Sequence, residues 1–161
     1  MGTVTYPDDD VIRLVTERFI AVQVNIREPR PDLKDLFRAA KPVWAPMFVA
    51  RNSRGSELAR WTGWLPPEEF RARLYLATML ERLVANDPEA AARDLVSAGE
   101  LTSIDEVKAE VMYWQGAVAY KLDGIEALRS IWTELIGEYP SSRWARSADV
   151  LEMESAPNRE R

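Results

Sequence analysis

The chain has 161 residues, of which 47% are apolar, and it contains no cysteine and no histidine. This length suits one medium domain or two small ones, with enough apolar residues to bury a core. The missing residue types exclude a thiolate nucleophile, a disulfide, an imidazole base and a zinc site with nitrogen or sulfur ligands.

Charge is distributed unevenly along the chain. Residues 1–86 carry 13 Lys and Arg against 11 Asp and Glu, whereas residues 87–161 carry 8 against 15, and the net charge is −5. This balance offers no basic face for a phosphate backbone, so we expect no nucleic-acid partner. No apolar run approaches the ~20 residues of a membrane span and no signal-peptide core is present, so we expect a cytoplasmic protein with no membrane contact.

The first forty residues predict two helices with a strand between them. Pro7 and the acids Asp8–Asp10 mark a helix start, and the next apolar residues recur at helical spacing. Residues 19–26 are apolar and rich in β-branched side chains, which is typical of a short, largely buried strand. After a loop, Asp32 is placed to cap a short second helix.

A hairpin and a long helix are predicted next. Residues 47–50 and 58–64 read as antiparallel strands joined by a turn at Asn52–Gly55, where glycine can take a positive φ. A long helix begins near Pro66, and its apolar residues, Val84 included, fall on two opposite sides. A helix of this kind is packed on both sides, one against the hairpin and the other against the C-terminal half of the chain.

The remainder of the chain is predicted to be helical. Gly99, Gly124 and Pro140 are expected to end the first three of four helices. We expect these helices over residues 88–96, 102–122, 125–139 and 141–153, and a frayed tail over residues 155–161.

The order of elements over residues 7–86 resembles the thioredoxin fold. The resemblance is carried by Val43-Trp44-Ala45-Pro46-Met47-Phe48-Val49, which is similar to the strand entry where that family keeps a cis-proline, by the hairpin turn and by Gly63 before a helix start. It implies that Pro46 is cis. It also implies a peptide-binding groove around Trp44, Ala45, Pro46, Gly63 and Trp64, in which the residue before the proline offers backbone hydrogen bonds to an extended guest. The alternative is that Trp44 and Trp64 pack in the core or at its rim.

The chain departs from the thioredoxin family where the redox chemistry would lie. In that family a central strand leads into Cys-x-x-Cys at a helix N-terminus, where the helix dipole lowers the thiol pKa. Residues 1–7 are similar to the segment that comes after that helix. The chain as written cannot exchange disulfides, and we expect no catalytic residue, cofactor or metal. It is either a non-catalytic protein- or peptide-binding scaffold or, alternatively, the C-terminal portion of an oxidoreductase whose Cys-x-x-Cys module lies upstream of Met1.

A sheet that lacks its central strand leaves residues 19–26 without a neighbour. Buried backbone groups must find hydrogen-bond partners. The segment can pair directly with the strand over 47–50, or the sheet can accept a strand from another chain, as a homodimer or with a strand-completing partner. We favour direct pairing.

The second half resembles tetratricopeptide-type helical hairpins. The resemblance is carried by Tyr113–Leu122, then Ala127, Ile131 and Trp132, then Tyr139-Pro140. Gly116 lowers helix propensity in mid-helix and Ala119 is also small, so close packing of two helices is their natural explanation. One full unit is visible, and since solenoids need about three repeats, we expect it to pack against the helix over 66–86.

The predicted fold class is therefore α/β. It comprises an incomplete thioredoxin-like domain over 1–86, which lacks its first and central strands, and a tetratricopeptide-like helical region over 87–154 packed against it. Four other groups can be explained without a catalytic or metal-binding role. Asp8–Asp10 form a helix start rather than a cation site. Glu68–Glu69 and Asp105–Glu106 serve helix dipoles rather than acid–base chemistry. Arg143, Trp144 and Arg146 form either a cationic–aromatic patch or a solvated face over a packed Trp144.

Overall fold

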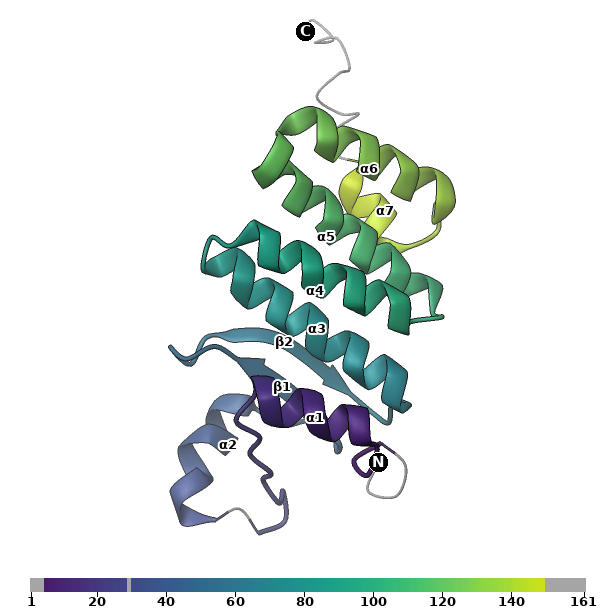
Figure 1. Ribbon diagram of the computed structural model, residues 1–161. Helices are drawn as coiled ribbons and strands as arrows, with labels where there is room; N and C mark the ends of the chain where they lie inside the picture. The colour runs from purple at the N-terminus through teal and green to yellow at the C-terminus, as the bar shows by residue number, and fades with distance from the viewer. Residues whose placement is uncertain (1–4, 29, 150–161) are drawn as a thin grey trace, which may run out of the picture. The chain divides into compact units, whose positions relative to one another are not determined.

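A computed structural model of the chain describes residues 5–28 and 30–149. The fold is mixed α/β and mostly helical, with one two-stranded antiparallel sheet among the described residues (Figure 1). Its elements are α1 (Asp9–Arg18), the 3-10 turn η1 (Pro31–Leu33), α2 (Lys34–Ala40), β1 (Met47–Arg51), β2 (Glu57–Thr62), α3 (Pro67–Val84), α4 (Pro88–Leu101), α5 (Asp105–Asp123), α6 (Ile125–Glu138) and α7 (Arg143–Ala148). Two compact units divide between Ala77 and Thr78, inside α3.

Helix α1 begins where the acidic run predicts. The Asp8 carboxylate accepts hydrogen bonds from the backbone N–H groups of Asp10 at 3.1 Å and Val11 at 3.0 Å, which satisfies two of the free donors of the first turn. Val11 and Leu14 are buried in one cluster with residues of α3. The predicted helix is confirmed, and its N-cap fixes where it starts.

The predicted hairpin is also confirmed. β1 and β2 pair antiparallel, with Met47 opposite Thr62 and Phe48 opposite Trp61. Gly55 takes φ +82° in the turn, in the region that favours glycine. Phe48 and Trp61 stack with ring centroids 5.3 Å apart, and both meet Phe70 of α3 edge to face at 5.0 and 5.9 Å. These aromatic contacts attach the sheet to the first half of α3.

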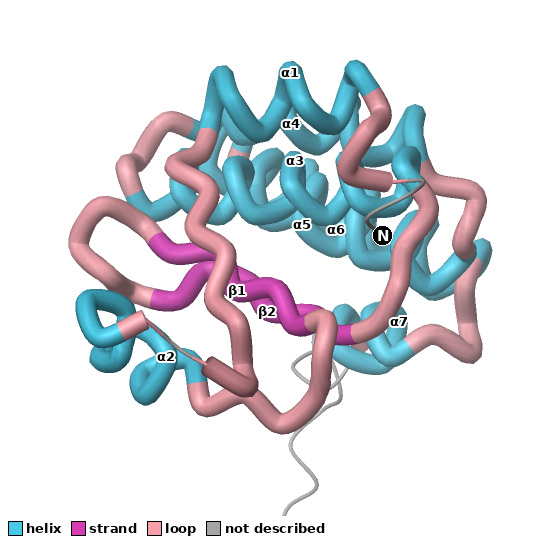
Figure 2. Tube along the Cα trace, turned by 90° about the horizontal axis from the view of Figure 1, so that it is seen from below, coloured by secondary structure: helices cyan, strands magenta, loops and turns pink. Residues whose placement is uncertain are grey.

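The predicted buried strand over residues 19–26 is wrong. Figure 2 shows this stretch as loop, and its Ile20 is 96% exposed. Direct pairing with β1 is wrong as well, because within the described residues β1 pairs with β2 alone. The sheet therefore has two strands rather than the three expected. β-branched composition favours an extended chain, but a strand also requires a neighbour that bonds its backbone.

The short second helix is present, but its expected cap is not. Position Leu33 precedes α2 and no side chain caps it. The Asp32 carboxylate instead accepts two hydrogen bonds from the Arg30 guanidinium, at 3.1 and 2.6 Å. The Asp32 carboxylate is therefore engaged in a charge-assisted pair with Arg30 and does not cap α2.

Helix α3 is buried along both of its predicted faces. Phe70 and Leu74 are buried on one, and Leu76 and Met79 on the other. Val84, expected on a buried face, is exposed, because it is the last residue of the helix. The two-sided pattern is confirmed everywhere except at this end.

In the second unit the helices occur in the predicted order with changed ends. α4 continues through Gly99 to Leu101, so Gly99 does not end the helix. The backbone becomes extended at Thr102, whose hydroxyl accepts a hydrogen bond from the Ile104 N–H at 3.2 Å. α5 ends at Gly124, with φ +89°, and α6 ends before the predicted proline. α7 begins at its Ser142 cap and ends at Ala148, short of the predicted end near 153. The predicted tail over 155–161 lies outside the described residues.

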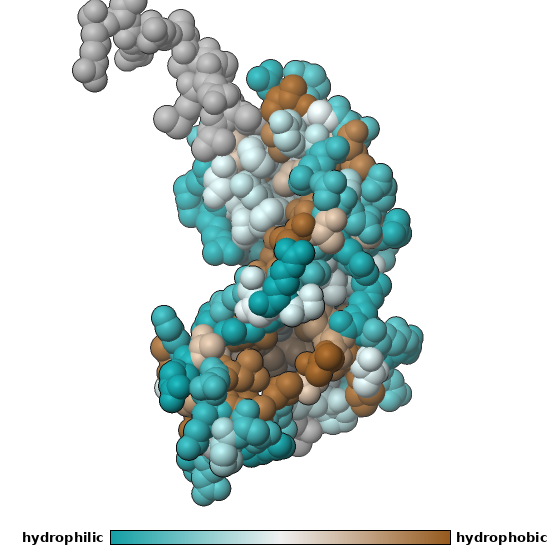
Figure 3. Space-filling view, turned by 90° about the vertical axis from the view of Figure 1, so that its left-hand side faces the viewer, coloured by the Kyte–Doolittle hydropathy of each residue, from teal (hydrophilic) through white to brown (hydrophobic). Residues whose placement is uncertain are grey.

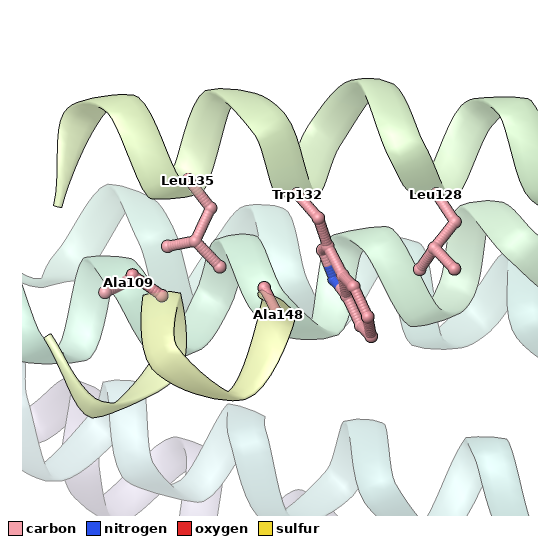
Figure 4. Close-up of a cluster of buried hydrophobic side chains, with 6 residues drawn as sticks. Ala109, Leu128, Trp132, Leu135 and Ala148 are labelled. Atoms are coloured by element: carbon pink, nitrogen blue, oxygen red, sulfur yellow. The ribbon is translucent and has the colours of Figure 1, made fainter. Parts of the chain in front are cut away.

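The close approach of α5 and α6 confirms the interpretation of Gly116. A Cβ built at Gly116 would overlap the Nε1 and Cδ1 atoms of Trp132. The Trp132 indole N–H donates to the Tyr113 carbonyl at 3.0 Å. Figure 4 shows Trp132 pointing from α6 toward α5, flanked by Leu128 and Leu135. The glycine makes room for the ring.

Candidate functional site

The hairpin brings two of the predicted groove residues together. Pro46 precedes β1 and Gly63 comes directly after β2, and the Gly63 N–H donates to the Pro46 carbonyl at 2.9 Å. Gly63 takes φ +93°, a conformation that favours glycine. The Ala45–Pro46 peptide bond is cis, as the resemblance implied. The end of the hairpin thus fixes the chain immediately after Trp44.

The two tryptophans of the predicted groove lie outside the core. Trp44 is 71% exposed and Trp64 is 54% exposed. The tryptophan that packs against the core of this unit is Trp61, which is partly buried and stacked on Phe48. Neither ring is therefore in the core; both are partly exposed at the surface, a position that packing at the rim of the core also describes.

A shallow apolar hollow lies beside Trp44. Its volume is about 430 Å³, and its lining is uncharged throughout. It is lined by Ile26, Phe37, Pro42, Val43, Trp44 and Ala45. The lower half of Figure 3 shows hydrophobic atoms around a hollowed part of the surface, at the height of the strands and α1 in Figure 1. Of the five predicted groove residues, Trp44 and Ala45 line this hollow, whereas Pro46, Gly63 and Trp64 do not.

Sequence reasoning misses Ile26, Phe37 and Val43 as lining residues. The sequence predicts a buried strand at Ile26 and a helix at Phe37, and neither pattern shows which distant segment a side chain will face. Val43 is 84% exposed. Val43 lies between Pro42 and Pro46, and prolines disfavour regular secondary structure. This is the one local signal that could have indicated a surface loop at Val43.

Arg60 of β2 holds the loop that carries Trp44. Its guanidinium donates to the Ala40 carbonyl at 2.7 Å, at the end of α2, and to the Glu57 carboxylate at 2.7 and 2.6 Å. The hydrogen bond from Arg60 lowers the pKa of Glu57, and the same bond raises the pKa of Arg60 itself. Residues 41–45 are thus fixed at both ends, by Arg60 and by the bond between Pro46 and Gly63.

The other acidic groups serve the structure. Asp10 pairs with Arg13 and with Arg71, both at 2.6 Å, at a second hollow of about 180 Å³ that is lined by charged residues of both signs. Glu69 is buried while Glu68 is exposed, so these carboxylates point in different directions. Over the described ranges, no group of three acidic side chains is placed to hold a metal ion.

The aromatic patch of the second unit is a packed cluster. Trp144 lies near Tyr113 and Trp114, with ring centroids 5.1 and 6.3 Å away, and the Arg143 guanidinium carbon lies 4.4 Å from the Trp144 ring centroid. Arg146 donates to the Ser141 carbonyl at 2.8 Å and so holds the start of α7. Arg143 thus lies over the ring of a partly buried Trp144, whereas Arg146 contacts the backbone of Ser141.

The fold and the hollow together define a mixed α/β protein with an exposed apolar surface beside a two-stranded sheet. No protein-family model, curated protein or solved structure matches this chain. Within residues 5–28 and 30–149, no helix has the length and apolar character needed to cross a membrane.

Proposed function

We propose that the chain is a non-catalytic protein that binds a segment of another polypeptide at the hollow beside Trp44. The observation that carries this proposal is the exposure of Trp44 and Val43 on a loop fixed at both ends. Exposed aromatic side chains on rigid backbone are typical anchors of protein interfaces. The absence of cysteine and histidine from the sequence supports a role in binding rather than in catalysis.

The energy available at Trp44 is large enough for recognition. A tryptophan presents up to about 250 Å², so a ring with most of its surface exposed leaves about 150 Å² for a partner to cover. At ~25 cal/mol/Å² this transfer from water is worth about 4 kcal/mol, before the entropy lost on binding reduces it. One covered tryptophan can therefore decide whether a peptide binds.

Two resemblances remain part of this proposal. The helix, hairpin and long helix of the first unit, with Gly63 bonded to Pro46, support a relation to the thioredoxin fold. The fit of Trp132 at Gly116 supports a relation of the second unit to tetratricopeptide-type hairpins. Both scaffolds are commonly used for recognition.

Selection from a library of random twelve-residue peptides tests the proposal. We expect enriched peptides that bind the wild-type chain, and a Trp44→Ala variant that binds them with about 2 kcal/mol less free energy, roughly 30-fold in Kd. Tyr120→Ala is the control for Trp44→Ala, because Tyr120 is also an exposed aromatic side chain but lies on α5, in the other unit. No enriched peptide, or equal affinity for wild type and Trp44→Ala, would refute the proposal.

A further inference from the structure

β1 has a free edge with unused hydrogen-bonding groups. The bond from Gly63 to Pro46 makes these two residues a hydrogen-bonded pair of the antiparallel ladder. Such pairs alternate along a strand, so Phe48 and Ala50 bond to β2, and the N–H and C=O groups of Met47 and Val49 point to the opposite edge. Among the described residues, no strand lies on that edge.

The hollow is lined by residues that lie close in sequence to β1 and to the segment over residues 19–26. Ile26 lies at the end of that segment and lines the hollow together with Val43 and Trp44, which lead into β1. No backbone hydrogen bond joins residues 20–26 to another described segment. The eight residues carry no charge, and Ile20, Val22 and Ile26 are exposed. The hollow thus has lining residues within a few positions of the free strand and within the unpaired apolar segment.

We propose that this surface accepts an extended strand of another polypeptide, which pairs with the outward groups of Met47 and Val49 and lays apolar side chains into the hollow. The inference rests on the proposed function and specifies its binding mode as strand addition to a sheet edge. Hydrogen bonds between the two backbones align the incoming strand with β1. Alternate side chains of that strand face the hollow, which favours apolar residues at those positions.

Charge identifies the chemistry of the incoming strand. Three lining residues adjoin cations in the sequence: Ile26 is followed by Arg27, Phe37 by Arg38, and Pro42 is preceded by Lys41. Arg38 pairs with Asp35, but no described carboxylate pairs with Arg27 or Lys41. An apolar strand with acidic residues at its ends complements this arrangement.

A second copy of this chain fits the same surface poorly. Its own strand-like segment over residues 19–26 is flanked by Arg18 and Arg27. Pairing that segment with β1 of another copy would bring these cations toward Arg27 and Lys41, and like charges across an interface disfavour it. The strand is therefore assigned to a different polypeptide.

Three synthetic peptides test the inference against the full chain. The first has alternating Val and Thr between terminal Asp residues, the second has terminal Lys residues instead, and the third repeats the first with an N-methyl group at every Val and Thr, so that neither of its edges can donate backbone hydrogen bonds to a strand. Calorimetry measures their affinity, and amide hydrogen exchange measures protection at Met47 and Val49. We expect the acidic peptide to bind at least about tenfold more tightly than either of the others and to slow exchange at both amides.

Two variants separate edge pairing from charge. Val49→Pro removes an outward N–H but leaves the bonds of Phe48 and Ala50 to β2, and proline is tolerated on edge strands; we expect a loss of at least about tenfold in affinity. Lys41→Glu leaves the sheet untouched and is expected to reverse the preference between acidic and basic peptides. Lys121→Glu, on α5, is the charge control and is expected to change nothing.

The outcomes distinguish this inference from the proposed function. If library peptides need Trp44 but bind Val49→Pro and Lys41→Glu unchanged, the hollow binds peptide and strand addition is refuted. If no peptide binds and Trp44→Ala has no effect, both proposals fail. If the unliganded chain is a dimer in solution with Met47 and Val49 already protected, a second copy occupies the edge and the assignment to another polypeptide is wrong.

Discussion

Replacement of Gly116 by alanine should destabilise the second unit, although alanine is the better helix former. A Cβ at this position would overlap the Nε1 and Cδ1 atoms of Trp132 and lie 3.3 Å from Leu128 Cδ1. The Trp132 ring cannot simply move aside. It stacks on Tyr113 with centroids 4.8 Å apart, and its N–H bonds the Tyr113 carbonyl.

The expected size of the effect is the sum of three terms. Alanine in place of glycine in a helix interior adds about 1 kcal/mol of stability. Forcing a methyl group against a packed ring costs about 2 kcal/mol, and loss of the Trp132 hydrogen bond costs about 1 kcal/mol more. Gly116→Ala should therefore lower the free energy of unfolding by about 2 kcal/mol.

Urea denaturation monitored by circular dichroism measures this difference. Gly137→Ala is the matched control, because Gly137 also lies in a helix of the second unit and nothing stands within 4 Å of its Cβ position. It should raise stability by a few tenths of a kcal/mol, since it lies one residue from the end of α6. An unchanged or higher urea midpoint for Gly116→Ala would refute the interpretation of this glycine as a packing requirement.

Three further predictions concern the ends of helices and the binding loop. Asp8→Ala should cost about 1 kcal/mol in urea denaturation, because it removes the cap of α1; a midpoint equal to that of wild type would contradict the cap. The hydrogen bond to Glu138 raises the pKa of Tyr139 from 10.0 to about 12. A raised folded-state pKa gives stability that is complete below pH 10 and is lost as pH rises through about 12, so wild type should lose stability over that window more steeply than Tyr139→Phe. Parallel losses would show that Tyr139 is not responsible. Arg60→Met should weaken peptide binding several-fold in calorimetry by releasing the loop before Trp44, whereas Arg54→Met in the exposed turn should not; equal affinities for both variants would show that Arg60 does not position the loop.

The features that could be predicted from the sequence are those decided by near neighbours. An acid before a helix and a glycine in a tight turn each have a local physical reason, and Asp8 and Gly55 behave accordingly. Gly99 is the counterexample, since a glycine inside a helix costs only about 1 kcal/mol. Its helix continues to Leu101.

The features that could not be predicted depend on distant partners. Residues 19–26 have the composition of a strand, but composition cannot supply the neighbouring strand that would bond their backbone. Trp44 and Trp64 could be selected as candidate binding residues because they lie near Pro46 and Gly63 in the sequence. Ile26 and Phe37 have no such neighbour in the sequence and could not be selected. Their approach to Trp44 depends on how α2 and the preceding loop fold back.

The way the loop before β1 is held bears directly on its capacity to bind. A side chain that must be ordered on binding costs free energy, and a loop that must be ordered costs more. Here residues 41–45 are already fixed by the bonds from Arg60 to Ala40 and from Gly63 to Pro46, while the ring of Trp44 stays exposed. Neither fixing bond involves Trp44 itself, so a partner can cover the ring without breaking them. The loop thus presents an exposed apolar side chain on a backbone already ordered by folding, which lowers the entropy cost of the binding that we propose.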